Sequence, residues 1–215
     1  MLCPRLAAYR AANRVANPDW FNAPVPGFGP PQATLLIVGL APGLKGANRT
    51  GRPFTGDHAG VLLYQTLLRL GLATGRYGAD PADGLTLLRC RIVNAVRCVP
   101  PANLPTPAEV ATCNRFLAAD LRTAPTPRGI LALGVVAHAA VLKAHGLPAA
   151  RLRFSHGAIH ELPRDRCGPV LLADSYHVSR YNTNTGRLTE QMFEAALRGL
   201  LQRMESPDAA ALAPT

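Results

Sequence analysis

The first stretch whose residue types could do chemistry is Gly39–Asp57, GLAPGLKGANRTGRPFTGD, which directly follows the apolar run TLLIV. It holds five glycines, two prolines and three cations, and its one carboxylate is its last residue, Asp57. Glycines let a backbone approach a ligand closely, and cations favour an anionic ligand. The stretch therefore predicts a loop that approaches a polyanion and carries an acid or base at its end.

This loop matches neither of two common phosphate-binding motifs. GLAPGLKG lacks the G-x-x-x-x-G-K-[ST] order of a phosphate-cradling loop and the G-x-G-x-x-G order of a dinucleotide site. Taken alone, it fits a Gly/Pro connector as well as it fits a binding loop. The rest of the chain has to separate these two interpretations.

The charge balance favours an anionic partner. The 215 residues carry 23 Lys+Arg against 13 Asp+Glu, a net charge of +10, and every cation except Lys45 and Lys143 is arginine. Such a surplus is typical of nucleic-acid binding, although a GC-rich genome, which favours Arg, Ala, Gly and Pro, explains it equally well. We find no membrane-spanning run and no signal peptide, so we expect a cytoplasmic protein. The five cysteines are then expected to be buried thiols or metal ligands, not disulfides.

Apolar, β-prone runs alternate with segments of helical period. The predicted strands are Thr34–Gly39, Arg91–Val96, Gly129–Gly134 and Val170–Ser175, and RFSHGAIHEL favours an extra strand before the fourth. The predicted helices are His58–Leu70, Pro107–Arg122, Val135–His145 and Thr189–Met204. The second helix has a clear start, with Thr106 as N-cap, Pro107 at the first helical position and Glu109 three residues after the cap.

This alternation predicts an α/β fold in which helices cover both faces of an open sheet. We expect a single domain over residues 1–205 and a disordered tail over residues 206–215. In such folds the ligand binds outside the carboxyl ends of the strands. The loops Leu40–Asp57, Asn94–Pro105 and Tyr176–Arg187 should therefore converge on one crevice.

The three loops together resemble the motifs of the uracil-DNA glycosylase superfamily, above all its family 5, the type B iron–sulfur branch. The resemblance is carried by GLAPGLKGANRTGRPFTGD, NAVRCVPPANLPTPAEVATC and SYHVSRYNTNTGRLT, and it runs from Cys3 to about Met204. It implies a three-layer α/β/α sandwich with a central, mainly parallel four-stranded sheet. It also implies a monofunctional glycosylase of base excision repair that removes uracil from DNA and tolerates other deaminated or modified bases.

A glycosylase turns the base out of the duplex and eases cleavage of the N-glycosidic bond. Uracil leaves as an anion from a sugar with oxocarbenium character, so the protein can stabilise either charge or position a water. Related families place an acid or amide side chain in the stretch that corresponds to Gly39–Gly43. This chain has no such side chain there, a pattern that resembles family 5. The family-matched carboxylate is Asp57, predicted to orient a water or stabilise the cationic sugar. Because Asp57 directly precedes a predicted helix, it is equally placed to be an N-cap, with or without a catalytic role.

The resemblance assigns three more side chains to a base pocket. Phe54 matches the aromatic residue that stacks on the extruded base. Asn94 matches the pocket amide, which offers both a donor and an acceptor to a uracil-like edge. His177 matches the histidine that hydrogen-bonds uracil O2 and, as a neutral imidazole, stabilises the leaving anion. Backbone amides are expected to complete the pocket, from Gly39, Leu40, Ala41 and Gly43.

The resemblance makes HVSRYNTNTGR the loop that inserts into DNA. Val178 stands where family members usually have proline, which removes a constraint on φ. Arg180 and Tyr181 are expected to wedge into the minor groove and fill the space left by the flipped base. Phosphate contacts are expected from a further set of polar residues, Asn48, Arg49, Arg52 and Arg187.

The cysteines are compared with the family's [4Fe–4S] cluster, which is held by an N-terminal C-x-x-C pair and two later cysteines. Cys98 and Cys113 match the later pair, and Cys3 matches the second member of the first pair. The first member would lie upstream of Met1, so three alternatives remain open: the given sequence starts too late, the cluster has an unusual fourth ligand, or there is no cluster. Zinc on the same thiolates is a further alternative. Cys90 and Cys167 match no ligand position.

We therefore expect a monomeric uracil-DNA glycosylase whose partner is uracil-containing DNA. The alternative is a non-catalytic uracil- or damaged-DNA-binding protein of the same fold, which the missing acid in GLAPG invites. Two other functions are also considered: a cysteine-ligated redox or cluster-carrying protein, and an α/β enzyme that acts on a small molecule. The last of these predicts no salt-sensitive DNA binding.

Overall fold

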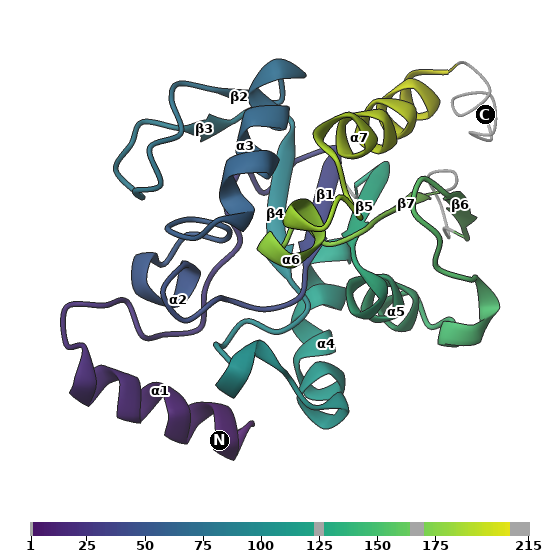
Figure 1. Ribbon diagram of the computed structural model, residues 1–215. Helices are drawn as coiled ribbons and strands as arrows, with labels where there is room; N and C mark the ends of the chain where they lie inside the picture. The colour runs from purple at the N-terminus through teal and green to yellow at the C-terminus, as the bar shows by residue number, and fades with distance from the viewer. Residues whose placement is uncertain (1, 123–126, 164–169, 207–215) are drawn as a thin grey trace.

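The computed structural model describes residues 2–122, 127–163 and 170–206 (Figure 1). The strands are β1 Leu35–Gly39, β2 Ala73–Thr74, β3 Thr86–Leu87, β4 Cys90–Asn94, β5 Gly129–Leu133, β6 Ile159–Leu162 and β7 Val170–Ser175. The helices are α1 Pro4–Ala16, α2 Ala47–Thr50, α3 Ala59–Arg69, α4 Pro107–Arg122, α5 Val135–Ala144, α6 Arg180–Asn184 and α7 Glu190–Glu205, with 3-10 turns η1 Pro101–Asn103 and η2 Ala149–Arg151. All but the first residue of the predicted tail lie outside the described residues.

The central sheet has the strand order β4-β1-β5-β7-β6. Its first four strands are parallel, and β6 pairs antiparallel with β7. The four predicted core strands therefore form the parallel part, and the extra strand expected in RFSHGAIHEL makes the sheet five-stranded instead of four-stranded. Every residue of β1, β5 and β7 is buried, which explains why these strands read as continuous apolar runs.

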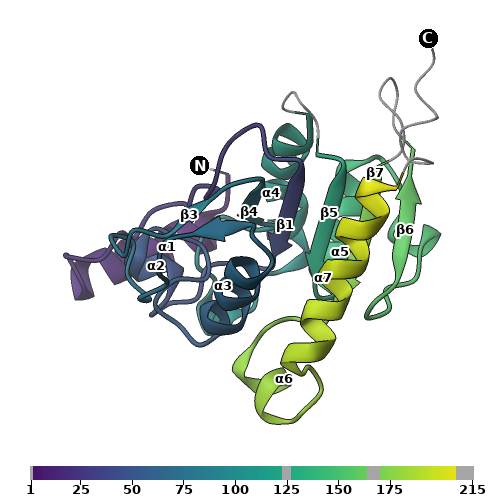
Figure 2. The same ribbon diagram turned by 90° about the horizontal axis from the view of Figure 1, so that it is seen from above.

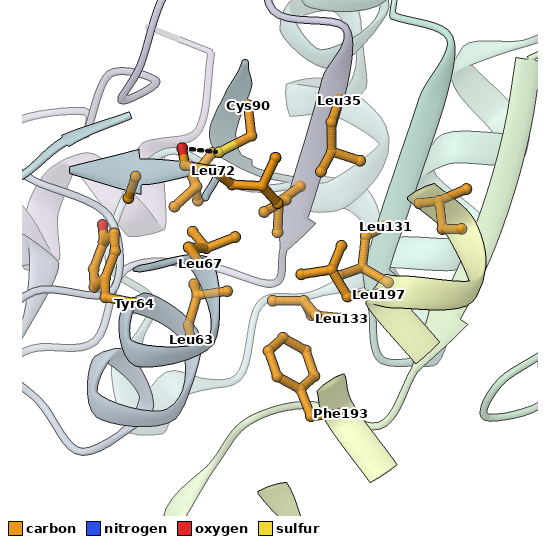
Figure 3. Packing of buried hydrophobic residues seen from close by; sticks show 14 of the residues in the cluster. Leu35, Leu63, Tyr64, Leu67, Leu72, Cys90, Leu131, Leu133, Phe193 and Leu197 are labelled. Carbon is orange, nitrogen blue, oxygen red and sulfur yellow. Dashed lines mark hydrogen bonds between the residues drawn. The ribbon is translucent and has the colours of Figure 1, made fainter. Parts of the chain in front are cut away.

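Helices cover both faces of this sheet, as the two ribbon views show (Figures 1 and 2). Leu35 and Ile37 of β1 point into a core formed with α3 and α7, whereas Leu36 and Val38 point into a core formed with α4 and α5. Figure 3 shows the first core, where Leu63 and Leu67 of α3 approach the side chains of Leu131, Phe193 and Leu197. The α/β/α sandwich implied by the resemblance is the observed architecture.

Local signals set the helix boundaries where they are strong. Thr106 Oγ1 accepts a hydrogen bond from the Glu109 N–H at 3.3 Å, and Glu109 Oε2 accepts one from the Thr106 N–H at 2.8 Å. This reciprocal capping box starts α4 at the predicted residue. None of the helices in the described residues has both the length and the apolar character needed to cross a bilayer.

The N-terminal helix α1 was not predicted, and it is held in place by polar contacts. Arg5 donates to both carboxylate oxygens of Glu109, at 2.8 and 2.7 Å, and so joins α1 to the start of α4. On the other side, Asn22 Nδ2 donates to the carbonyl of Asn17 at 2.8 Å, just past the end of α1. These contacts bring Cys3 close to the loop after β4.

Candidate active site

A cavity of about 510 Å³ opens at the carboxyl ends of the parallel strands. Its walls come from the three loops that the sequence predicted to converge, and it has the size of a small-molecule site. The residues that line it are Leu40, Ala41, Gly43, Ala47, Phe54, Asp57, His58, Ala59, Asn94, Asn103, His177, Ser179 and Arg180.

The floor of the cavity is made where β1 and β4 end side by side. Gly39 and Asn94 are direct partners in the parallel register of these strands. A Cβ on Gly39 would lie 2.5 Å from Phe54 Cζ and closer still to Asn94 Oδ1. Glycine is required here because both side chains lie directly over the strand backbone. The structure thus brings residues 39, 54 and 94 together.

The Phe54 ring faces the imidazole of His177 across the cavity. Their ring centroids are 6.0 Å apart, with an angle of 34° between the ring planes. Phe54 has a φ of 52°, a left-handed conformation that is unusual for a phenylalanine. The hydroxyl of Tyr77 donates to the Phe54 carbonyl at 3.2 Å, and Tyr64 donates to the Pro53 carbonyl at 2.5 Å. These bonds hold a backbone conformation that costs on the order of 1 kcal/mol or more.

Asn94 lines the cavity and has a buried, unpaired acceptor. Its side chain is only 6% exposed, and its Oδ1 atom has no hydrogen-bond partner among the described residues. Leaving a buried acceptor unpaired costs about 1–3 kcal/mol. A ligand that brings an N–H group to this position would recover that free energy.

His177 is held as a neutral imidazole. Burial lowers its pKa to about 4, because the charged form is poorly solvated in this site. The next residue, Val178, is fully buried in the core under α3 and α7. Packing of the Val178 side chain therefore restrains this segment at the position where proline is usual in the resembling family. The Asn182 amide adds a hydrogen bond to the His177 carbonyl at 2.8 Å.

Asp57 combines a capping contact with a place in the cavity wall. Its Oδ1 accepts the Ala59 N–H at 3.2 Å at the start of α3. Burial raises the pKa of this carboxyl group. A Cβ on Gly43 would lie 2.8 Å from Asp57 Oδ2, and one on Gly46 would lie 2.7 Å from Asp57 Cγ. The glycines of this loop therefore make room for the chain's own carboxylate.

The structure corrects two of the expected phosphate contacts. Arg52 is 5% exposed and binds both carboxylate oxygens of Asp83, at 2.8 and 2.7 Å. This ion pair lowers the pKa of Asp83. Asn48 is fully buried and donates to Asn22 Oδ1 at 2.9 Å. Both side chains are buried in the protein, so neither is available to a DNA backbone.

Four other expected DNA contacts are exposed. Arg180 lines the cavity and Tyr181, next to it, is 70% exposed; both begin α6. Arg49 is also exposed, on α2. The guanidinium of Arg187 lies 4.7 Å from the centroid of the Tyr176 ring. Arg187 therefore has a partner within the protein while it remains accessible.

Tyr176, the residue before His177, has a second aromatic partner. The imidazole of His156 stacks on the Tyr176 ring, with centroids 4.9 Å apart and an interplanar angle of 10°. His156 Nδ1 also accepts the Tyr176 N–H at 3.2 Å. These contacts fix the backbone from which the His177 side chain projects.

Asn103 lines the same cavity and was missed at the sequence level. Asn103 and Ala102 have φ values of 58° and 53°, two successive residues in the left-handed region. Such strained conformations cluster at functional sites. The available signal was its position two residues after the Pro100–Pro101 pair, in a loop already expected to face the crevice.

The three family-matched cysteines lie together, apart from the base-sized cavity. Cys3, Cys98 and Cys113 line a second cavity of about 340 Å³. The Arg97 N–H donates to Cys113 Sγ at 3.3 Å, and the buried Nε of Arg10 has no partner among the described residues. Cys90 lies elsewhere, in the core under α3 and α7, and Cys167 is outside the described residues.

Comparison with known proteins gives a consistent result. The chain matches the family described as "Uracil DNA glycosylase superfamily" over residues 26–201. It is 48% identical over 198 residues to a "Type-5 uracil-DNA glycosylase" of Thermus thermophilus, covering 89% of this chain and 88% of that protein. A protein of the same description from Mycobacterium leprae is 45% identical, over 91% and 87% of the two chains. A "Type-4 uracil-DNA glycosylase" of Pyrobaculum aerophilum is 36% identical over 64% of this chain.

Proposed function

Because the chain belongs to the uracil-DNA glycosylase superfamily, we propose that its cavity excises uracil from DNA by hydrolysis of the N-glycosidic bond. The observation that carries this assignment is the buried, unpaired Oδ1 of Asn94, set beside Phe54 and His177 in one cavity. The same chemistry accepts other deaminated bases that present an N–H to this acceptor. The reaction initiates base excision repair.

The pocket recognises the base by stacking and by one amide. The ring of Phe54 stacks on the flipped base, an interaction worth about 1–3 kcal/mol. Asn94 Oδ1 accepts the N3–H of uracil and its Nδ2 donates to O4, which satisfies the orphan acceptor. Gly39 permits this arrangement because any side chain there would collide with both residues.

Bond cleavage separates an anionic base from a cationic sugar. As the bond between N1 and C1′ breaks, its electron pair moves to the base, and the neutral imidazole of His177 donates an N–H to O2. A donor aimed at developing charge in a buried site typically supplies about 10²–10³ in rate. Water adds to C1′ and the proton that it loses ends on the uracil anion, so the products are neutral uracil and an abasic sugar.

Asp57 is the group that faces the sugar side of the reaction. Its carboxylate lies in the cavity wall beside Gly43, where it stabilises the oxocarbenium-like C1′ or orients the attacking water. The Ala59 N–H holds the carboxylate in place, so the capping and catalytic roles are compatible. Asn103 lines the same cavity and supplies a second polar group to this water.

The test is excision from a duplex with a single uracil, followed by alkali treatment that cleaves abasic sites. We expect an abasic product from the parent protein, slowed about 100-fold or more by Asp57→Ala and by His177→Ala, with little change in DNA affinity. Tight, uracil-selective binding with no abasic product would instead assign the cavity to a non-catalytic binder.

The exposed residues at the mouth of the cavity hold the DNA. Arg180 and Tyr181 lie where the groove of a duplex must approach if its base enters the cavity. Arg49 and Arg187 are the exposed cations proposed for phosphate contacts. Arg180→Ala should weaken DNA binding and reduce the slope of log K against log salt concentration by about 1.

The cysteine cavity is the proposed site of a [4Fe–4S] cluster. Cys3, Cys98 and Cys113 supply three thiolates, and the Arg97 N–H and the unpaired Nε of Arg10 offer donors to a polyanionic, sulfur-rich group. A tetrahedral zinc site needs thiolates about 3.8 Å apart. The three sulfurs do not form a group within 4.8 Å among the described residues, so the thiols are not arranged there as a preformed zinc site. Bound there, the cluster stabilises the contact between α1 and the loop after β4.

Iron and sulfide analysis of freshly purified protein tests this assignment. We expect about four of each per chain in the parent, and loss of both with brown colour in Cys98→Ser. Colourless protein without iron, from an expression that includes any natural upstream residues, would rule the cluster out.

A further inference from the structure

A second polar cluster lies on the opposite side of β7 from the base-binding residues. It consists of His138 on α5, His160 on β6 and Asp174 on β7, and their ligand-type atoms all lie within 4.8 Å of one another. Asp174 is fully buried and His138 is 2% exposed. None of the three lines the cavity that holds Phe54 and His177. The proposed base excision therefore leaves this cluster without a role.

The contacts of His138 define what must lie between it and Asp174. Its Nε2 lies 3.0 Å from the Leu152 carbonyl, which can only accept, so Nε2 carries a hydrogen. In the neutral ring, Nδ1 then presents its lone pair to Asp174 Oδ1 at 2.7 Å. Two acceptors this close require a cation between them, either a proton or a metal ion.

The other carboxylate oxygen lies close to the second imidazole. Asp174 Oδ2 lies 3.3 Å from His160 Nε2 and accepts the Ser155 N–H at 3.2 Å. His160 Nε2 can donate to Oδ2 from a neutral ring without any added cation, whereas a divalent cation would be bound by both imidazoles and the carboxylate at once. A hydrogen bond from the outer ring nitrogen of His138 to a carbonyl is also the usual support of a metal-bound histidine.

We propose that His138 Nδ1, His160 Nε2 and the Asp174 carboxylate bind a divalent metal ion, with zinc as the best match to this ligand set. Imidazole nitrogens and carboxylate oxygens bind zinc at about 2.0–2.2 Å. Four tetrahedral ligands at that distance lie about 3.3 Å apart, so the 2.7 Å contact must open by about half an ångström while the 3.3 Å contact is already suitable. The two imidazole nitrogens and one oxygen of the Asp174 carboxylate supply three of the ion's four ligands.

The burial of these ligands makes the site structural. Asp174 is fully buried and His138 nearly so, which leaves little of the ion open to a substrate. The ion joins α5, β6 and β7, three elements that are distant in sequence. Asp174 is three residues before His177, so the ion also fixes the end of the strand that leads into the base pocket. The site exists whether or not that pocket excises uracil.

The experiment measures the response of the full chain to zinc after removal of bound metal with a chelator. At a zinc concentration about a hundredfold above the Kd, we expect the Tm to rise by roughly 5–10 °C. Asp174→Asn keeps the shape of the side chain and can still hydrogen-bond His138, but it should abolish the rise. His160→Gln, at a partly exposed position, is the milder second variant and should reduce it.

The cysteines are controlled separately, because thiolates also bind zinc. Cys98→Ser should keep the zinc-induced rise in Tm. Co²⁺ added to the parent should give ligand-field bands that Asp174→Asn loses, without the sulfur-to-metal charge transfer of a thiolate site. The proposal is overturned if zinc leaves the Tm of the parent unchanged, which assigns the contact to a proton. It is also overturned if Asp174→Asn keeps the full response, or if Cys98→Ser abolishes it.

Discussion

The room that the glycines leave for Asp57 leads to a testable prediction at Gly46. A Cβ at this position would overlap Asp57 Oδ2 and lie 2.7 Å from Asp57 Cγ, whereas ordinary contact begins near 3.4 Å, so Gly46→Ala must push the carboxylate by about 1 Å. Gly46 does not line the cavity, so the new methyl group does not contact the base. Catalytic groups misplaced by about 1 Å lose up to roughly 100-fold in rate. We therefore expect Gly46→Ala to slow excision by about 10- to 100-fold.

A double-mutant cycle with Asp57→Ala separates this effect from any backbone cost of alanine. Single-turnover excision of uracil from a duplex is measured for the parent, both single variants and the double variant. If Gly46→Ala acts through the carboxylate, it should add little once Asp57 is gone, because residues in contact are not additive. Overpacking predicts a loss of about 1–3 kcal/mol in unfolding free energy for the single variant, reduced in the double.

Gly199→Ala on α7 is the matched control, since a Cβ there meets only Ile159 Cδ1 at 3.9 Å. Its excision rate should equal that of the parent. The reasoning fails if Gly46→Ala slows excision by the same factor with and without Asp57, or if it leaves the rate of the parent unchanged.

Three further predictions follow from the same geometry. Asn94→Ala should raise the KM for uracil-containing duplex and slow excision by about 10²–10³, as expected for loss of a bidentate polar contact; an unchanged rate would remove Asn94 from the pocket. His177 stays neutral in the fold because its pKa is about 4 instead of the usual 6.5, so protonation destabilises the folded state. The loss of unfolding free energy due to His177 is therefore absent above pH 6.5 and grows to about 3 kcal/mol as pH falls towards 4. In urea unfolding measured over this pH range, His177→Gln should make the unfolding free energy depend less on pH. Arg52→Ala leaves the buried Asp83 carboxylate without its charge partner, although Asp83 keeps its bonds from the Gly78 and Leu85 N–H groups, and should cost about 3 kcal/mol of unfolding free energy. Arg180→Ala, at an exposed position, is the control and should weaken DNA binding without changing Tm. If Arg52→Ala instead weakened DNA binding and left Tm unchanged, Arg52 would belong to the DNA interface.

The sequence alone determined the architecture, because the relevant signals are local. Buried parallel strands are mostly apolar runs, as in the first four residues of Val170–Ser175, and the predicted bounds of this strand match the structure. The capping residues before α4 specify its start through contacts three residues apart. Helix α1 was missed because its position depends on distant partners, chiefly Glu109, which is 104 residues away from Arg5. The fifth strand β6 was anticipated as an extra strand, and its antiparallel pairing with β7 is a tertiary result.

Sequence motifs also indicated which loops meet at the strand ends, but they did not reveal what each side chain does there. Arg52 and Asn48 lie in a polar loop, where exposure is the usual expectation, and only the fold shows that their partners are Asp83 and Asn22. The glycines suggested close approach to a ligand, whereas in the structure they accommodate the Asp57 carboxylate. The unpaired oxygen of Asn94 and the neutral state of His177 depend on burial, which is a property of the packed chain and not of any segment of it. For the same reason the cluster of His138, His160 and Asp174 emerged only when α5, β6 and β7 were brought together.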